Sequence, residues 1–132
     1  MPEPLYLDAS AAVKLVVEES ESWALAERLA DRVIISSEVC RVELARALLR
    51  LGLGVGAVRL GRRVVDRLEL LRLDARVLDR ACEVGSPTLR GLDAIHLASA
   101  LELDRDVDAF VTYDRRLAEA AEAEGLSVLS PV

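Results

Sequence analysis

Short apolar runs alternate along this chain with longer stretches in which apolar residues recur three and four positions apart. The short runs are typical of buried strands, and the longer periodic stretches are typical of helices that pack on a core. The pattern predicts strands over residues 5–7, 33–35, 70–73, 109–112 and 127–129. It predicts a short helix beginning near Ser10 and helices over residues 22–30, 37–51, 55–65, 75–84, 92–103 and 115–124, with Gly125 at a helix C-terminus.

This alternation of strands and helices predicts an α/β fold with a mostly parallel sheet of about five strands, covered by helices on both faces. The loosest segments, residues 52–56 and 85–87, are typical of breaks between helices, and there is no linker, repeat or low-complexity stretch. We therefore expect one domain over residues 1–132. Ligands of open α/β sheets bind outside the carboxyl ends of the strands, so polar residues at those ends are the candidates for a site.

Composition and charge narrow the classes of function. Apolar residues make up 52% of the chain, which indicates a packed core and not a disordered segment. The formal net charge of -6 argues against a protein that clamps nucleic acid non-specifically through lysine and arginine. An acidic nuclease remains possible, because a divalent cation can supply the positive charge at the point of cleavage.

The two cysteines, Cys40 and Cys82, lack the spacing of a metal site. We expect both to be buried free thiols in a reducing cytosol. The first residues show neither the basic start nor the apolar run of a signal peptide, and no apolar stretch approaches the roughly 20 residues of a membrane span. The sequence therefore predicts a cytoplasmic protein with no membrane association.

Four carboxylates stand where a site is expected: Asp8, Glu43, Asp93 and Asp114. Two of them follow predicted strands, one begins an apolar helix, and Glu43 lies one to two turns into the helix after the second strand. Each has a local alternative. The aspartates could cap helices, and Glu43 could pair with Arg46 or Arg50.

Held together at one end of a sheet, these carboxylates would repel one another unless they were protonated or neutralised. A divalent cation would neutralise them. Magnesium prefers oxygen ligands and usually binds only one or two carboxylates directly, keeping water and substrate phosphate as its other ligands. Such an ion can polarise a phosphodiester and position an attacking water.

Four segments in this order resemble the PIN-domain family over essentially the whole chain. They read LDASA at residues 7–11, SEV at 37–39 leading to ELARA at 43–47, LDAIHLASA at 92–100, and VTYDRRL at 111–117. The compact chain and its RGLDA block at residues 90–94 look like the VapC-type toxins of that family. One such segment alone would carry little weight, but all four in sequence are a strong signal.

The resemblance implies a three-layer α/β/α domain that uses Mg²⁺ or Mn²⁺ to hydrolyse single-stranded RNA. It implies that Asp8 and Asp93 ligate the metal directly, that Asp114 binds through water or holds a second ion, and that Glu43 ligates or orients the attacking water. The residues that match the family's supporting hydroxyls are Ser10 and Thr112. VapC-type toxins usually form homodimers and are held inactive by a small VapB-type antitoxin, whose basic tail would suit an acidic groove.

Two other functions stay open at this point: a catalytically silent PIN fold that only binds a partner, and an RNA-processing nuclease that is not a toxin. A phospho-acceptor receiver domain is disfavoured, because it needs a lysine after a late strand and the only lysine is Lys14.

We expect His96 to be packed and hydrogen-bonded rather than catalytic, and Trp23 to anchor packing or an interface. Candidate arginines for RNA are Arg41, Arg46, Arg50, Arg90, Arg115 and Arg116, although for each of them the pattern favours a solvated or ion-paired side chain.

Overall fold

A wholly parallel five-stranded sheet forms the centre of the computed structural model, which describes residues 2–132. Its strands lie in the order β3-β2-β1-β4-β5. They are β1 (Leu5–Leu7), β2 (Ile34–Ser37), β3 (Glu69–Leu71), β4 (Ala109–Val111) and β5 (Val128–Leu129). The predicted sheet of about five strands is confirmed, and its pairing is fully parallel.

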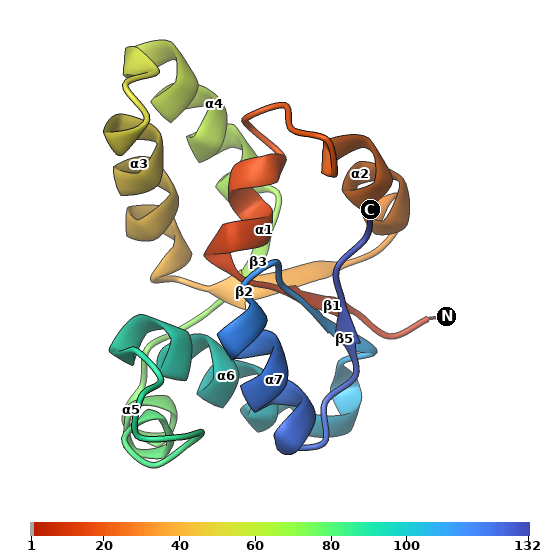
Figure 1. Ribbon diagram of the computed structural model, residues 1–132, viewed down its shortest axis with the longest axis vertical. Coiled ribbons are helices and arrows are strands. Elements are labelled where there is room, and N and C mark those ends of the chain that lie inside the picture. Colours follow the sequence, from red (N-terminus) through yellow and green to blue (C-terminus); the bar gives the residue numbers. More distant parts are fainter. Residues whose placement is uncertain (1) are drawn as a thin grey trace.

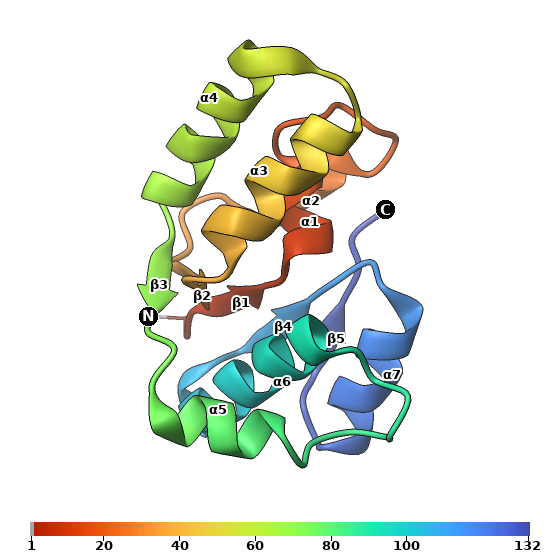
Figure 2. The ribbon, with the colours of Figure 1, turned by 90° about the vertical axis from the view of Figure 1, so that its left-hand side faces the viewer.

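Helices cover both faces of this sheet, as Figures 1 and 2 show. The helices are α1 (Ala9–Lys14), α2 (Ser22–Leu29), α3 (Cys40–Arg50), α4 (Gly54–Asp66), α5 (Ala75–Ala81), α6 (Gly91–Leu103) and α7 (Arg115–Ala123), with a 3₁₀ turn, η1, at Asp104–Asp106. Helices α1 to α4 lie on one side of the sheet and α5 to α7 on the other (Figure 2). The three-layer α/β/α arrangement is therefore confirmed.

Alternating side chains of the two central strands pack into two separate cores. In β1, Leu5 and Leu7 pack into the core beneath α1 to α4, whereas Tyr6 belongs to the core beneath α6 and α7. Strand β4 does the same with Val111 on the first side and Phe110 on the second. Because both faces are covered, every position of these strands is buried, which is why the sequence shows continuous apolar runs there.

The strand order places a topological switch point between β1 and β4. The chain leaves β1 into α1 on one face of the sheet and leaves β4 into α7 on the other (Figure 1). Where two neighbouring parallel strands send their connections to opposite faces, a crevice opens outside their carboxyl ends. Asp8 and Asp114, which begin these two connections, lie at that crevice.

Several sequence-based details are corrected by the structure. Strand β2 extends to Ser37, which pairs with Leu71, so α3 begins three residues later than predicted, at Cys40. Cys40 is buried as expected, but the expectation that Cys82 is buried was wrong. It caps the C-terminus of α5, where Val77 alone is buried.

The expectation that Trp23 anchors packing within the chain was also wrong, because its side chain is 76% exposed. An interface role for Trp23 stays a prediction. Among residues 2–132, no helix is long and apolar enough to cross a membrane.

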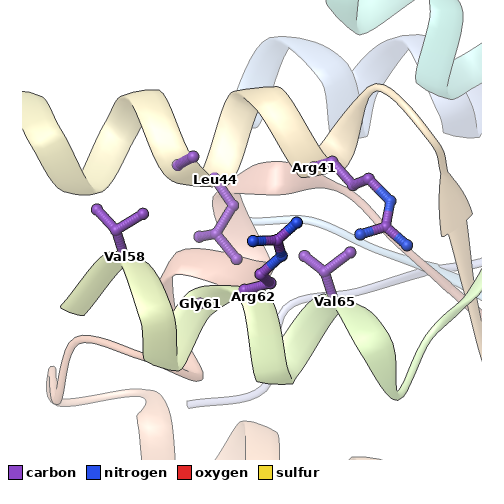
Figure 3. Close-up of a pocket in the computed structure, with 7 residues that line it drawn as sticks. Arg41, Leu44, Val58, Gly61, Arg62 and Val65 are labelled. Atoms are coloured by element: carbon purple, nitrogen blue, oxygen red, sulfur yellow. The ribbon is translucent and has the colours of Figure 1, made fainter. Parts of the chain in front are cut away.

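Helices α3 and α4 form a hairpin that packs very closely at one glycine. A Cβ atom added to Gly61 would lie 2.7 Å from Cδ1 of Leu48 and 3.5 Å from the Leu44 side chain. Beside this close approach is a cavity of about 230 Å³ lined by Leu44, Val58 and Val65 and by two arginines, of which Arg62 lies between Leu44 and Val65 and Arg41 lies farther along α3 (Figure 3). Its lining residues include no carboxylate, so this cavity is not the acidic hydrolytic site that the sequence predicts.

The close approach at Gly61 predicts that a larger residue will force the hairpin apart. We expect Gly61→Val to lower the free energy of unfolding by about 1–3 kcal/mol, the usual cost of overpacking a core. Gly56→Val in the same helix is the matched control, since nothing lies within 4 Å of its added Cβ. Its effect should stay within about 0.5 kcal/mol. Equal urea midpoints for the two variants would contradict the packing described for α3 and α4.

Candidate active site

The buried carboxylate of Asp8 accepts more hydrogen bonds than the other three acidic side chains of the candidate site. Asp8 directly follows β1, is 3% exposed, and accepts hydrogen bonds on both oxygens. Its Oδ1 accepts from the Ser10 hydroxyl at 2.7 Å and from the Ala11 backbone N–H at 3.0 Å. Its Oδ2 accepts from the Thr112 hydroxyl at 2.6 Å. Asp8 therefore caps α1 and also faces the end of β4.

The hydroxyls of Ser10 and Thr112 join this carboxylate to the segment that follows β4. The Ser10 hydroxyl accepts from the backbone N–H of Tyr113 at 3.0 Å, and the Thr112 hydroxyl accepts from that of Asp114 at 3.1 Å. The two hydroxyl oxygens lie 3.3 Å apart. Ser10 and Thr112 thus join two distant segments at the switch point, and their supporting role in catalysis stays a prediction.

The other three carboxylates line one cavity of about 800 Å³. Glu43 comes from the first turn of α3, Asp93 from the first turn of α6, and Asp114 from the residue that caps α7. The side chain of Asp114 also accepts from the Leu117 backbone N–H at 3.1 Å, so its predicted capping role is real and coexists with its place in the cavity.

Asp93 is close enough to the other three carboxylates for their charges to act on it. Partial burial raises the pKa of Asp93, and the charges of Asp114, Asp8 and Glu43 raise it further, against a lowering by His96. Burial likewise raises the pKa of Asp8, although its bonds from Thr112 and Ser10 oppose the shift. The fold therefore brings the four predicted acidic residues together closely enough for three of their charges to raise the pKa of the fourth.

Glu43 is held by His96 rather than by an arginine. Its Oε1 lies 2.6 Å from the Nε2 atom of His96, and within residues 2–132 the structure shows no bond from Glu43 to Arg46 or Arg50. His96 is 1% exposed, so the expectation of a packed, hydrogen-bonded histidine is confirmed. The sequence analysis missed its contact with Glu43. The one available signal was its position three residues after Asp93, which places both on one side of α6.

The donor chemistry of the cluster fits a hard cation. In residues 2–132, no group of three or more His, Cys, Asp or Glu side chains is arranged to hold a metal ion by itself. Magnesium does not require such a group, since one or two carboxylates with water molecules and a substrate phosphate are its usual ligands. The carboxylate oxygens around the cavity, where burial and then the neighbouring negative charges raise the pKa of Asp93, fit this kind of site.

Exposed arginines flank the carboxylates in two adjoining hollows. Arg46 and Arg50 line one of about 440 Å³ that also contains Glu43. The other, of about 290 Å³, contains Asp93 and Asp114 and is lined by Arg90, Arg115 and Arg116. Arg41 differs from these, because its guanidinium lies 3.5 Å from the Asp66 carboxylate on α4. Basic groups thus lie on two sides of the acidic cavity.

Comparison with known proteins identifies relatives that span nearly the whole chain. The family model described as PIN domain matches residues 5–123. Ribonuclease VapC46 of Mycobacterium tuberculosis is 47% identical over 128 residues, which cover 96% of this chain and 97% of that protein. Ribonuclease VapC35 of the same organism is 44% identical over 133 residues, covering 96% of each chain.

Two solved structures share the fold at low sequence identity. The crystal structure of Mycobacterium tuberculosis VapC20, described as a Sarcin-Ricin loop cleaving toxin, has a TM-score of 0.75 at 15% identity and covers 96% of this chain and 99% of its own. A toxin–antitoxin complex from Klebsiella pneumoniae has a TM-score of 0.70 at 16% identity, covering 97% and 98%. With the matching family model and these close sequence relatives, the chain belongs to the PIN-domain family, in its VapC group.

Proposed function

We propose that this protein is an endoribonuclease toxin that hydrolyses phosphodiester bonds of RNA with the help of Mg²⁺ or Mn²⁺ and is inhibited by a cognate antitoxin. The observation that carries the proposal is the convergence of Asp8, Glu43, Asp93 and Asp114 at the carboxyl ends of β1 and β4. The curated relatives at 38–47% identity are named ribonucleases, which supports RNA as the substrate. The proposal treats residues 1–132 as a single catalytic domain.

In this proposal, Asp93 and Asp8 are the main metal ligands, and Asp114 binds through water or supports a second ion. The bound cation would neutralise the carboxylates, polarise the scissile phosphate and favour ionisation of the attacking water. Glu43 either ligates the ion or accepts a hydrogen bond from the attacking water and so orients it. Ser10 and Thr112 fix the Asp8 carboxylate in one orientation through their hydroxyls.

The arginines beside the cavity supply local positive charge to a protein whose net charge of -6 is unfavourable for RNA binding. Guanidinium groups bind phosphates in a bidentate manner. With Arg46 and Arg50 on one side and Arg115 and Arg116 on the other, an RNA strand can contact arginine before and after the scissile bond. The acidic cavity itself would repel RNA unless a cation were bound, which couples binding of the substrate to binding of the metal.

The same surface suits an inhibitory antitoxin. A peptide with basic side chains would find carboxylates in the cavity, and the hollow beside Glu43 also presents apolar Val39, Val42 and Leu92. Large apolar side chains remain exposed on the α3–α4 hairpin, including Leu49, Leu53 and Val55. These support association with an antitoxin, with a second copy in a homodimer, or with both.

The direct test is cleavage of total bacterial RNA by the purified, antitoxin-free protein. We expect discrete fragments with Mg²⁺ or Mn²⁺ and none with a chelator. Asp93→Asn, which removes a charge and little volume, should lower the rate by at least about 100-fold while the protein stays folded. The matched control is Asp79→Asn on the exposed part of α5, which should cleave like the wild type.

Equal cleavage by wild type and Asp93→Asn would remove Asp93 from the mechanism. No cleavage by folded, antitoxin-free protein would favour the alternative of a silent PIN-fold binding module. Cleavage without growth arrest on expression in a bacterial host would favour an RNA-processing nuclease that is not a toxin.

The flanking arginines give a separate prediction. Replacing Arg115 and Arg116 together by alanine should weaken RNA binding. It should also reduce the slope of a plot of log K, the association constant for RNA, against the logarithm of salt concentration by about one for each phosphate that is no longer neutralised. The control is the pair Arg59 and Arg63 on α4, which lies outside the three hollows around the carboxylates. Filter binding of the inactive Asp93→Asn protein across salt concentrations measures both slopes. Identical slopes for the two double variants would exclude Arg115 and Arg116 from the RNA path.

A further inference from the structure

A chain of hydrogen bonds connects the interior of the sheet to one carboxylate of the candidate site. His96, the only histidine of the sequence, lies on α6 and is 1% exposed. Its Nδ1 atom is 2.8 Å from the hydroxyl oxygen of Tyr6 on β1, and its Nε2 atom is 2.6 Å from Oε1 of Glu43 on α3. Three elements from distant parts of the chain thus meet through one imidazole ring.

The donor and acceptor inventory fixes the direction of the bond between His96 and Glu43. An ionised glutamate only accepts hydrogen bonds, so Nε2 of His96 has to carry a hydrogen. In a neutral imidazole the other nitrogen, Nδ1, then accepts, and the hydroxyl of Tyr6 donates to it. Tyr6 remains a phenol at neutral pH, because burial raises its pKa well above the usual value.

The Tyr6 ring is itself immobilised by packing. It is fully buried and stacks on the Phe110 ring with centroids 5.3 Å apart and an interplanar angle of 6°. It meets the His96 ring edge to face, with centroids 5.8 Å apart and an angle of 74°. Neither ring can turn without disturbing the core between β1, β4 and α6, so the position of Nε2 is set by the fold.

Glu43 is the part of the cluster that most needs such support. Asp8 and Asp114 are fixed by backbone N–H groups of the helices they cap, but Glu43 has a longer side chain with more rotatable bonds. Its side chain is only 14% exposed and lines the cavity that contains Asp93 and Asp114. Without the bond to His96, the carboxylate could turn toward Arg46 or Arg50, which share the neighbouring hollow.

We propose that His96 is a positioning residue: through its Tyr6-fixed ring it holds Oε1 of Glu43, so that Oε2 is presented to the acidic cavity in one orientation. This inference rests on the proposed nuclease function for its catalytic meaning. Its geometric part, the tautomer and its two partners, does not depend on RNA cleavage.

The tautomer is testable by ¹⁵N NMR, because a single histidine gives one set of imidazole signals. We expect Nε2 of His96 to carry a hydrogen in the folded protein, and a displaced Nε2 signal in Glu43→Ala. Tyr6→Phe keeps the stacked ring and removes only the donor to Nδ1, so it should broaden or shift the Nδ1 signal. An Nδ1–H tautomer in the wild type, or an Nε2 signal unchanged in Glu43→Ala, would overturn the proposal.

Cleavage rates at saturating metal then test whether this geometry matters for catalysis. We expect His96→Leu, which keeps bulk but removes the donor, to lower the rate by at least about tenfold, as misplacement of catalytic groups does. The amide of His96→Gln can still donate to Glu43, so this variant should recover most of the rate. Leu101→Ala, a buried change on the same helix, is the control for general destabilisation and should keep the wild-type rate at temperatures where it is folded.

Full activity in His96→Leu, or equal losses in His96→Leu and Leu101→Ala, would show that His96 is only part of the core. If His96→Leu does not fold, Tyr6→Phe decides, because the proposal requires a loss of about threefold or more from this folded variant. If the wild-type protein cleaves no RNA while the NMR signals are as expected, the nuclease function fails and the His96–Glu43 contact stands. The two failures are therefore distinguishable.

Discussion

A buried charge at the meeting point of two parallel strands is the constraint on which this structure depends. Asp8 is placed there because β1 ends between β2 and β4, and a carboxylate can remain in that position only if its oxygens are satisfied. Ser10, Ala11 and Thr112 provide the donors. These bonds start α1, join the end of β4 to the end of β1, and bring Asp114 to the cavity, so the satisfaction of one carboxylate organises the site.

The local and functional interpretations of the acidic residues turn out to be compatible. Asp8 caps α1 and Asp114 caps α7, which agrees with the local interpretation that these aspartates stabilise helix N-termini. Both caps nevertheless lie at the switch point of the sheet, where a capping carboxylate also faces the crevice. Helix N-termini partly offset the repulsion among these charges. Partial burial raises the pKa of Asp93, and the charges of Asp114, Asp8 and Glu43 raise it further, which a bound cation would oppose.

The sequence was sufficient to predict the sheet, its two helical layers and the four acidic positions, because periodicity and motif order depend on local patterns. It could not predict which partner holds Glu43, since Arg46 and Arg50 are near in sequence and His96 is near only in space. The exposure of Cys82 was missed for a similar reason: its position at the end of α5 depends on how that helix meets α6. The chemical roles of the carboxylates stay a proposal, although their convergence was foreseen.

The central claim is that the folded protein holds carboxylates in mutual repulsion that a divalent cation relieves. Melting temperatures of metal-free wild type and Asp93→Asn, measured from about pH 4 to neutral pH, test it directly. Because the pKa of Asp93 is raised in the folded state, its ionised form destabilises the fold above that pKa. Near neutral pH, the melting temperature of metal-free Asp93→Asn should therefore be higher than that of the wild type, and this difference should disappear in acid. Millimolar Mg²⁺ should raise the melting temperature of the wild type more than that of the variant. A metal-free variant that melts lower than wild type at neutral pH, or equal metal shifts in both proteins, would contradict this claim.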